Sequence, residues 1–203
     1  MTASGDADRG PTSGDAEASA ALVGAPNAGK SVLFGRLTAE YADVSNYPGT
    51  TVETTAATLG STRLIDTPGV HGISSFSEEE RATRAVVLEA DAVVNVVDAT
   101  RLDRDLFVTL QLLDMGVPTV VALNMMDEVE ADGVEIDVGA LEATLGVPVV
   151  PTVAVTGAGV DELRDRLPEA TAPESTPVDA YYDALPDGIE AGRAEKTLLV
   201  EGD

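Results

Sequence analysis

Apolar stretches of the chain predict its strands. Four of them are almost continuously apolar, as is typical of strands covered on both faces of a sheet. They lie at 20–23, 92–97, 117–123 and 147–150. Two further stretches, 52–59 and 62–65, flank the turn residues Gly60-Ser61 and predict a hairpin. Together these patterns predict six strands.

Other stretches place apolar residues at helical spacing. The first, at 30–39, carries Val32, Leu33 and Leu37. The second runs to Glu89 and begins after Ser77, which resembles an N-cap followed by three glutamates. The remaining helices are predicted at 102–115, 138–145 and 159–167, and the polar segments 41–51 and 66–77 are predicted loops.

Strands and helices alternate along the chain, which predicts the α/β class. We expect a three-layer αβα domain whose six-stranded sheet is mostly parallel, with one antiparallel edge strand. The domain should cover 19–168, after a disordered tail at 1–18 and before an acidic, loosely ordered segment at 169–203. Ligands of such sheets bind at the carboxyl ends of the strands.

A glycine-rich loop follows the first predicted strand. Residues 24–31, Gly-Ala-Pro-Asn-Ala-Gly-Lys-Ser, fit the phosphate-binding loop G-x-x-x-x-G-K-[ST]. Backbone N–H groups of such a loop and the ammonium of Lys30 would bind a polyphosphate. The sequence therefore predicts a P-loop NTPase fold.

The composition restricts the partners. The 203 residues carry 36 acidic and 12 basic side chains, a net charge of −24, so nucleic acid and anionic membrane surfaces are unfavourable ligands. Such an acidic composition, with two lysines, is typical of a very salty cytosol, where self-repulsion is screened.

The absence of cysteine excludes disulfides and thiolate chemistry. The first residues lack the apolar core of a signal peptide, and no stretch reaches the roughly 18 apolar residues of a membrane span.

Three further motifs follow predicted strands and point to a guanine nucleotide. Asp66 could hold Mg²⁺ through water, and the Gly69 N–H could approach a γ-phosphate. Asp127 could accept both N1–H and N2–H of guanine, while Asn124 could bond the loop backbone and the base edge. The Ala154 N–H could donate to guanine O6. The candidate nucleotide-binding residues are Gly24, Ala25, Pro26, Asn27, Ala28, Gly29, Lys30, Ser31, Val32, Gly49, Thr50, Thr51, Asp66, Gly69, Asn124, Met125, Asp127, Val153, Ala154 and Val155.

At this point the sequence resembles a known family. The segments that carry the resemblance are 46–53 (Asn-Tyr-Pro-Gly-Thr-Thr-Val-Glu), 77–80, 94–99 and 123–127. They are similar to the GTPase domain of ferrous iron transport protein B, FeoB, an Era-like GTPase, over about 20–167 and faintly at 178–182. In that family a helical domain and a transmembrane iron(II) permease follow. Neither is present here, so we expect either a fragment or a permease on a separate chain.

The resemblance implies roles for single residues. Ser31 and Thr51 would bind Mg²⁺, Lys30 would bridge the β- and γ-phosphates, and Asn27 would hold a K⁺ ion. Lys30, Asn27, Thr51 and Gly69 are thus the candidate catalytic residues. Potassium there would offset the charge that develops between the β- and γ-phosphates, as an arginine finger does elsewhere.

Three positions depart from most GTPases. Val70 stands where many have the glutamine that orients the attacking water, although the family usually has an apolar residue there. Intrinsic hydrolysis should therefore be slow. Met125 replaces a lysine, and Val153 replaces a serine, so base affinity should be reduced without loss of guanine selectivity.

Other residues have a functional and a plainer interpretation. His71 is either a general base or, more simply, an exposed loop residue. Glu78, Glu79 and Glu80 are either iron(II) ligands or a helix start. The arginines at 101 and 104 are either an arginine finger or a solvated helix face, and the aspartate at 98 is interpreted as a strand-end cap.

The function implied is a Mg²⁺-dependent, K⁺-stimulated GTPase that regulates iron(II) transport at the inner, cytoplasmic face of the cell membrane. Its partners would be GTP, GDP and a FeoB-type permease, with no nucleic acid; homo-oligomer formation is left open. The alternatives are an Era-like GTPase of ribosome or RNA maturation, which usually carries a basic domain that this chain lacks, and a nucleotide-binding module without turnover.

Overall fold

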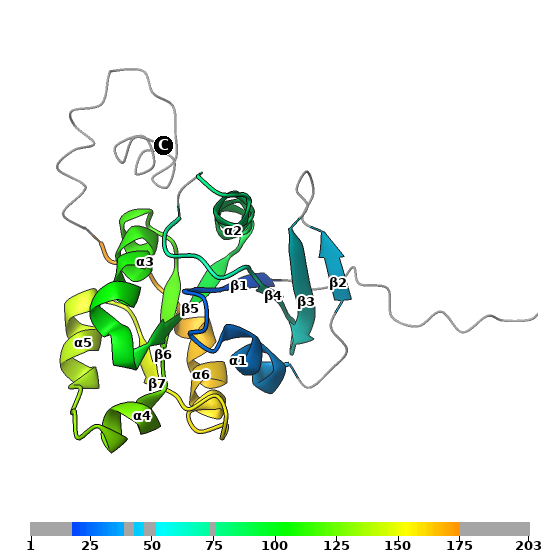
Figure 1. Ribbon diagram of the computed structural model, residues 1–203. Coiled ribbons are helices and arrows are strands. Elements are labelled where there is room, and N and C mark those ends of the chain that lie inside the picture. Colours follow the sequence, from blue (N-terminus) through cyan, green and yellow to red (C-terminus); the bar gives the residue numbers. More distant parts are fainter. Residues whose placement is uncertain (1–17, 39–42, 47–51, 74–75, 175–203) are drawn as a thin grey trace, which may run out of the picture.

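Seven strands form a single sheet in the order β2-β3-β4-β1-β5-β6-β7 (Figure 1). The structure is a computed structural model, and it describes residues 18–38, 43–46, 52–73 and 76–174. The strands are β1 Ala18–Gly24, β2 Asp43–Asn46, β3 Glu53–Leu59, β4 Thr62–Asp66, β5 Ala92–Asp98, β6 Thr119–Asn124 and β7 Val149–Pro151. All six predicted strands are therefore confirmed, and β2 is additional.

The extra strand changes the edge of the sheet. β3 runs antiparallel to both of its neighbours, β2 and β4, while the pairs β1–β4, β1–β5, β5–β6 and β6–β7 are parallel. The single antiparallel strand is thus β3, the second from the edge, whereas the sequence predicts it at the edge itself. β2 lies in a predicted loop because its sequence, Asp-Val-Ser-Asn, has a single apolar residue, Val44, which is 64% exposed. Pairing with β3 makes it a strand, and that pairing leaves no apolar pattern in the sequence.

Six α-helices lie in the described part of the chain. They are α1 Lys30–Leu37, α2 Glu78–Glu89, α3 Leu102–Asp114, α4 Met126–Ala131, α5 Val138–Leu145 and α6 Val160–Arg166, with short 3₁₀ turns at Ala99–Arg101 and Leu167–Glu169. Ser77 caps α2 as predicted, because its hydroxyl accepts from the Glu80 N–H while the Glu80 carboxylate accepts from the Ser77 N–H. Sequence reasoning missed α4, which is only six residues long.

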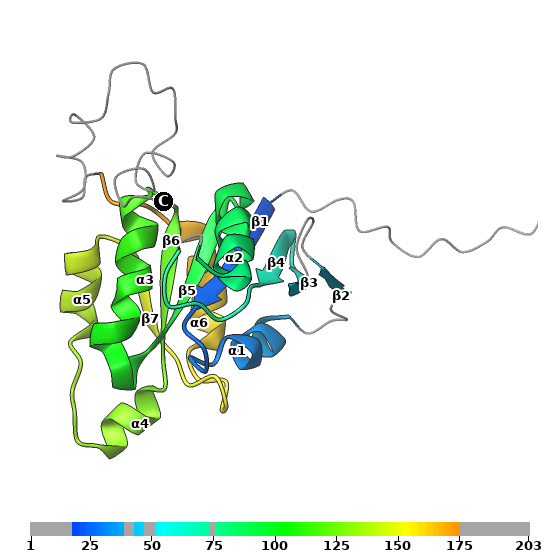
Figure 2. The ribbon, with the colours of Figure 1, turned by 45° about the horizontal axis from the view of Figure 1, so that its top comes forward.

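The helices cover both faces of the sheet and make the three predicted layers (Figures 1 and 2). Successive residues of β1 point to opposite faces. Ala20 and Leu22 pack with α1 and α6, whereas Ala21 and Val23 pack with α2 and α3. A third apolar cluster lies between β6, β7 and the helices α3, α4 and α5. None of the helices in the described segments has the length and hydrophobicity needed to cross a membrane.

An ion pair covers the outer edge of β7. The Arg166 guanidinium donates to both carboxylate oxygens of Glu142, at 2.8 and 3.0 Å. The Glu142 carboxylate also accepts from the Val149 N–H at 2.8 Å, and Arg166 donates to the Val149 carbonyl at 3.4 Å. These side chains pair with backbone groups that an edge strand otherwise exposes.

This pair predicts a pH-dependent contribution to stability. The Arg166 hydrogen bond, and then the Val149 N–H, hold the pKa of Glu142 below its ordinary value. The contribution is therefore fully present above the ordinary glutamate pKa of about 4.3 and is lost as the pH falls through the lower folded-state value. Because the pair is partly exposed, Glu142→Gln should lower the free energy of unfolding by about 1 kcal/mol at pH 7, measured by urea unfolding.

The matched control is Glu130→Gln, which removes an exposed carboxylate from α4. We expect little change from it at pH 7, and a loss from Glu142→Gln that shrinks in acid. Equal losses from both variants, or a Glu142 effect independent of pH, would contradict the role assigned to the pair.

Candidate nucleotide-binding site

The phosphate-binding loop joins the carboxyl end of β1 to α1. A side chain on Gly24 would collide with the Val96 carbonyl, and one on Gly29, whose φ is 95°, would collide with the Asn124 amide. Both positions therefore require glycine. Gly29 is the N-cap of α1 and offers no side chain to its first N–H groups. These N–H groups, at the positive end of the helix dipole, are suited to bind phosphate.

Lys30 lies beneath this loop and is only 7% exposed. Its ammonium donates to the carbonyl oxygens of Gly24 at 3.2 Å and Ala25 at 3.5 Å. Burial lowers the pKa of Lys30, and the charges of Asp66 and Asp105 oppose that shift. The ammonium is thus held at the loop, beside the groups expected to bind the phosphates.

Ser31 and Asp66 form a pair of oxygen donors beside Lys30. The Ser31 hydroxyl donates to Asp66 Oδ2 at 2.9 Å. Among the described residues, Asp66 Oδ1 is the buried side-chain oxygen without a hydrogen-bond partner. Burial raises the pKa of Asp66, while the Ser31 hydroxyl and the Lys30 charge lower it. A hydroxyl and an unpaired carboxylate oxygen are ligands that Mg²⁺ prefers, so these two residues fit the metal.

The segment after Asp66 packs directly against the phosphate-binding loop. A Cβ on Gly69 would lie 2.8 Å from Pro26 Cα, so the Gly69 backbone can approach the loop only as glycine. The Val70 N–H donates to the Gly24 carbonyl at 3.1 Å, and the Val70 side chain is buried. Val70 is therefore a core residue and cannot orient a water molecule. Further along, the Ile73 N–H donates to Gln111 Oε1 of α3 at 2.8 Å.

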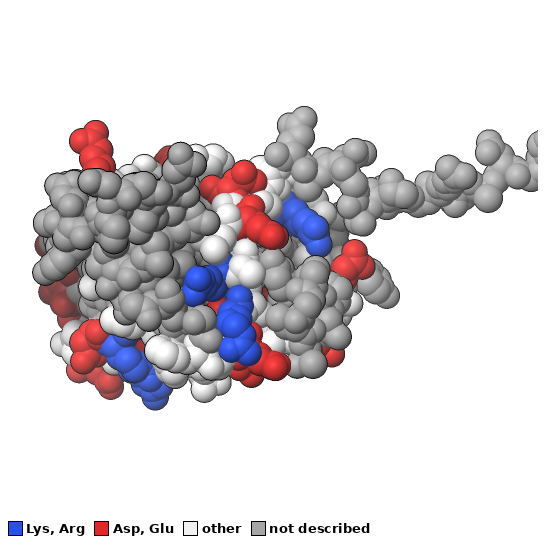
Figure 3. All heavy atoms as spheres, turned by 90° about the horizontal axis from the view of Figure 1, so that it is seen from above, with Lys and Arg blue, Asp and Glu red and all other residues white. Residues whose placement is uncertain are grey.

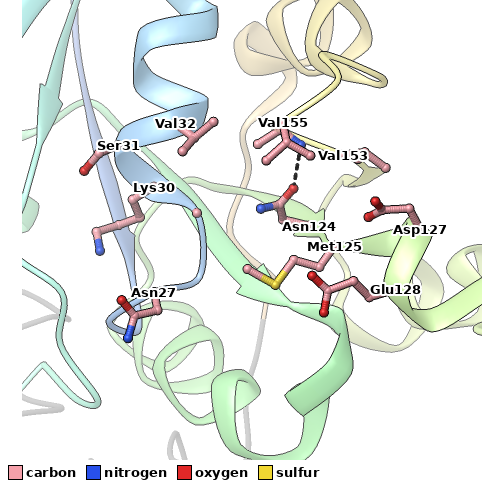
Figure 4. A pocket seen from close by; sticks show the side chains of 12 residues that line it. Asn27, Lys30, Ser31, Val32, Asn124, Met125, Asp127, Glu128, Val153 and Val155 are labelled. Atoms are coloured by element: carbon pink, nitrogen blue, oxygen red, sulfur yellow. Dashed lines mark hydrogen bonds between the residues drawn. The ribbon is translucent and has the colours of Figure 1, made fainter. Parts of the chain in front are cut away.

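A pocket of about 390 Å³ opens beside α1 (Figure 4). It is walled by the start of α1, by the end of β6 with α4, and by the loop after β7. The lining residues are Asn27, Gly29, Lys30, Ser31, Val32, Asn124, Met125, Asp127, Glu128, Val153, Ala154 and Val155. The pocket thus brings together the phosphate-binding loop and the two segments predicted to bind a base.

Asn124 connects the walls of this pocket and is 2% exposed. Its amide Nδ2 donates to the Ala28 carbonyl of the phosphate-binding loop at 2.9 Å, as the sequence predicted. Its Oδ1 accepts from the Ala154 N–H at 2.9 Å and from the Thr152 hydroxyl at 3.3 Å. The Ala154 N–H, which the sequence predicts to bind guanine O6, is therefore directed at Asn124 in this structure. The Asn124 side chain thus joins the loop after β7 to the phosphate-binding loop through hydrogen bonds.

Two positions of the site have left-handed backbone conformations. Asn27 has φ 66° in the phosphate-binding loop, and Met125 has φ 65° between β6 and α4. The turn at Met125 places Asp127 and Glu128 in the first turn of α4, where both line the pocket (Figure 4). The predicted residues Gly49, Thr50 and Thr51 lie outside the described residues.

Several residues with two interpretations lie as the plainer one describes. His71 is exposed on its loop, and the glutamates 78–80 form the first turn of α2. Asp98 is a strand-end cap, because its carboxylate accepts from the N–H and the hydroxyl of Thr100. The nearby arginines 101 and 104 pair with carboxylates of their own segment.

Sequence reasoning missed two residues of the site. Glu128 lines the pocket, and nothing in its sequence context indicates this. Arg36, in the last turn of α1, donates to the Val155 carbonyl at 2.5 Å. From the sequence alone, a basic residue there is explained by the helix dipole.

Comparisons with known proteins show the family to which the chain belongs. The family model described as ferrous iron transport protein B matches residues 18–167. The chain belongs to this family. A curated FeoB relative, the Fe(2+) transport protein A/Fe(2+) transporter FeoB fusion protein of Porphyromonas gingivalis, is 45% identical over 154 residues, 72% of this chain and 18% of the relative. The chain thus spans about a fifth of the length of the curated relatives that it matches.

Solved FeoB structures share the fold, which is that of a P-loop GTPase. A mutant NFeoB of S. thermophilus bound to GDP superposes with a TM-score of 0.83 at 33% identity, covering 92% of this chain and 80% of that one. NFeoB of S. thermophilus bound to GDP.AlF4- and K+ has a TM-score of 0.73 at 33% identity, covering 89% and 77%.

Proposed function

We propose that this FeoB domain binds GTP and hydrolyses it slowly to GDP and phosphate, and that it thereby regulates iron(II) transport across the cell membrane. The observation that carries the proposal is the single pocket in which Lys30 and Ser31 lie at one end and Asp127 at the other, with Asn124 between them. A guanosine polyphosphate has its charged and its base groups at the same two ends.

Guanine selectivity would come from Asp127. Its exposed carboxylate is free to accept N1–H and N2–H of guanine, a pair of donors that adenine does not have. Met125 and Val153 supply apolar walls to the pocket in place of the lysine and serine of most GTPases. The base would therefore be selected by the carboxylate and held weakly by its surroundings.

The phosphates would be bound by the N–H groups that begin α1 and by the Lys30 ammonium. Ser31 and Asp66 would hold Mg²⁺, with Thr51 as a further ligand. Mg²⁺ held there would supply positive charge that offsets the charge developing on the phosphates. Gly69 keeps the segment after Asp66 against the loop, so that its N–H can approach the γ-phosphate.

Hydrolysis would depend on positioning, because Val70 stands at the place of the water-orienting glutamine. Val70 is buried, and His71 is exposed on the loop. Asn27 would hold K⁺ where an arginine finger acts in other GTPases. This role is supported by the S. thermophilus NFeoB structure whose ligands are GDP.AlF4- and K+.

The potassium role makes a specific prediction. GTP turnover with Mg²⁺ should be about tenfold faster in concentrated KCl than in equally concentrated NaCl, since an arginine finger supplies still more. Asn27→Ala should remove this difference while GDP still binds. The measurement is phosphate release by the purified chain. Equal rates in the two salts would leave Asn27 a structural role and would overturn K⁺ activation.

The link to iron transport is proposed from the family. The curated relatives are Fe(2+) transporters, and this chain matches about a fifth of their length. The partner of this chain would be a FeoB-type permease, and the chain would lie at the inner face of the cell membrane. On the visible part of the face in Figure 3, Lys and Arg are interspersed with Asp and Glu, a mixture that offers nucleic acid no continuous counter-charge. Unchanged iron(II) uptake after deletion of the chain would contradict the proposal.

A further inference from the structure

The loop after β7 forms the outer wall of the base pocket. Val153, Ala154 and Val155 line it, and Val155 is 65% exposed. The root of the loop is fixed by the bond from the Ala154 N–H to Asn124. Beyond Ala154, hydrogen bonds close the loop on itself: Val153 accepts from the N–H groups of residues 156 and 157 and donates to Ala158. These bonds shape the tip of the loop but do not attach it to the opposite wall.

Arg36 attaches the tip to that wall. Its Nη2 donates to the Val155 carbonyl at 2.5 Å, across 119 residues of sequence. Arg36 lies on α1 about 9 Å along the axis from Lys30, at 1.5 Å per residue. Val32 of the same helix also lines the pocket. The helix that begins at the phosphate site therefore also holds the wall that faces the base.

The contact matters because other contributions to base binding are weak. Met125 stands where most GTPases have a lysine, and Asp127 is exposed. The wall formed by Val153, Ala154 and Val155 must then contribute a larger part of the free energy that retains the base. A charge-assisted bond to a carbonyl is among the stronger contacts available for fixing such a loop.

We propose that Arg36 is a positioning residue that holds the Val155 carbonyl, keeps the loop closed on the base, and thereby slows release of the bound guanine nucleotide. This inference rests on the proposed function, because it assumes that the pocket binds GDP. Arg36 itself does not touch the base; it acts through the loop.

The test is the release of a fluorescent GDP analogue from the loaded chain, chased with excess GDP, beside the association rate. Arg36→Ala should release the analogue about fivefold faster, with association changed by less than about twofold, as expected for loss of one exposed charge-assisted bond. Arg36→Lys should restore part of the slow release, because an ammonium can still donate to a carbonyl. The melting temperature without nucleotide should stay the same.

Arg63→Ala is the matched control, since it removes the same charge from an exposed position on β4 that does not line the pocket. Three results would each overturn the inference. They are unchanged release from Arg36→Ala, equally fast release from Arg63→Ala, and a lower melting temperature of Arg36→Ala that by itself accounts for the faster release. If the unmodified chain failed to bind the analogue, the proposed function would fall as well. Normal binding with unchanged release would overturn the Arg36 role alone.

Discussion

Replacing Lys30 by methionine should reduce GTP turnover by about 10²–10³-fold, the cost of removing one preorganised donor from a site of charge development. Lys30 is 7% exposed and its ammonium already lies at the phosphate-binding loop, 3.2 Å from the Gly24 carbonyl. Methionine keeps most of the volume of the buried stem and removes the ammonium, with both its charge and its N–H donors. The measurement is phosphate release from GTP at saturating nucleotide.

The fold should survive this change, because a buried charge is exchanged for an apolar group. Circular dichroism and thermal unfolding of Lys30→Met check that point. The second lysine, Lys196, provides a control for lost positive charge. Turnover by Lys30→Met within about threefold of the unmodified rate would contradict the role of the ammonium in transition-state stabilisation.

Replacing Asn124 by alanine should weaken GDP binding by about 100-fold and destabilise the domain. The change leaves the Ala154 N–H, the Ala28 carbonyl and the Thr152 hydroxyl without their present partner. Each buried group left unpaired costs about 1–3 kcal/mol. The loop after β7 then loses its attachment to the phosphate-binding loop. The segments predicted to bind the base and the phosphates are therefore no longer held at a fixed distance from each other. Titration calorimetry with GDP and urea unfolding measure the two effects.

A second buried asparagine separates stability from binding. Asn95 on β5 is fully buried, donates to the Val23 carbonyl and accepts from the Thr109 hydroxyl, but it does not line the pocket. Asn95→Ala should therefore destabilise the domain by a similar amount while folded protein keeps its GDP affinity. Equal losses of affinity in both variants would show that Asn124 acts through stability alone.

The centre of the sheet was predictable from the sequence because its strands are buried on both faces. In β1, β5 and β6 most residues are apolar, and this signal can be recognised in the segment itself, without knowing which strands lie beside it. β2 could not be predicted for the opposite reason. Its residues are polar, and Val44 is exposed, so the strand exists through backbone pairing with β3. α4 was missed because it has six residues and starts from a left-handed Met125 without a capping side chain.

In the candidate site, too, one part could be predicted from the sequence and another could not. The motif revealed the phosphate-binding loop because two of its glycines are required: Gly24 by the close Val96 carbonyl, and Gly29 by its positive φ and the close Asn124 amide. The Asn124–Ala154 and Arg36–Val155 bonds join segments 30 and 119 residues apart, and their partners are backbone groups. A backbone N–H or carbonyl has no sequence signature, so such contacts appear only with the fold.

The most direct test of the account is phosphate release from GTP and from ATP by the purified chain, with Mg²⁺ in concentrated KCl, beside Lys30→Met. Asp127 and Lys30 at the two ends of one pocket predict slow but measurable turnover of GTP. ATP should show no release above the Lys30→Met background. Equal turnover of the two nucleotides, or GTP turnover no faster than the variant's, would contradict the assignment of this pocket as a GTPase site.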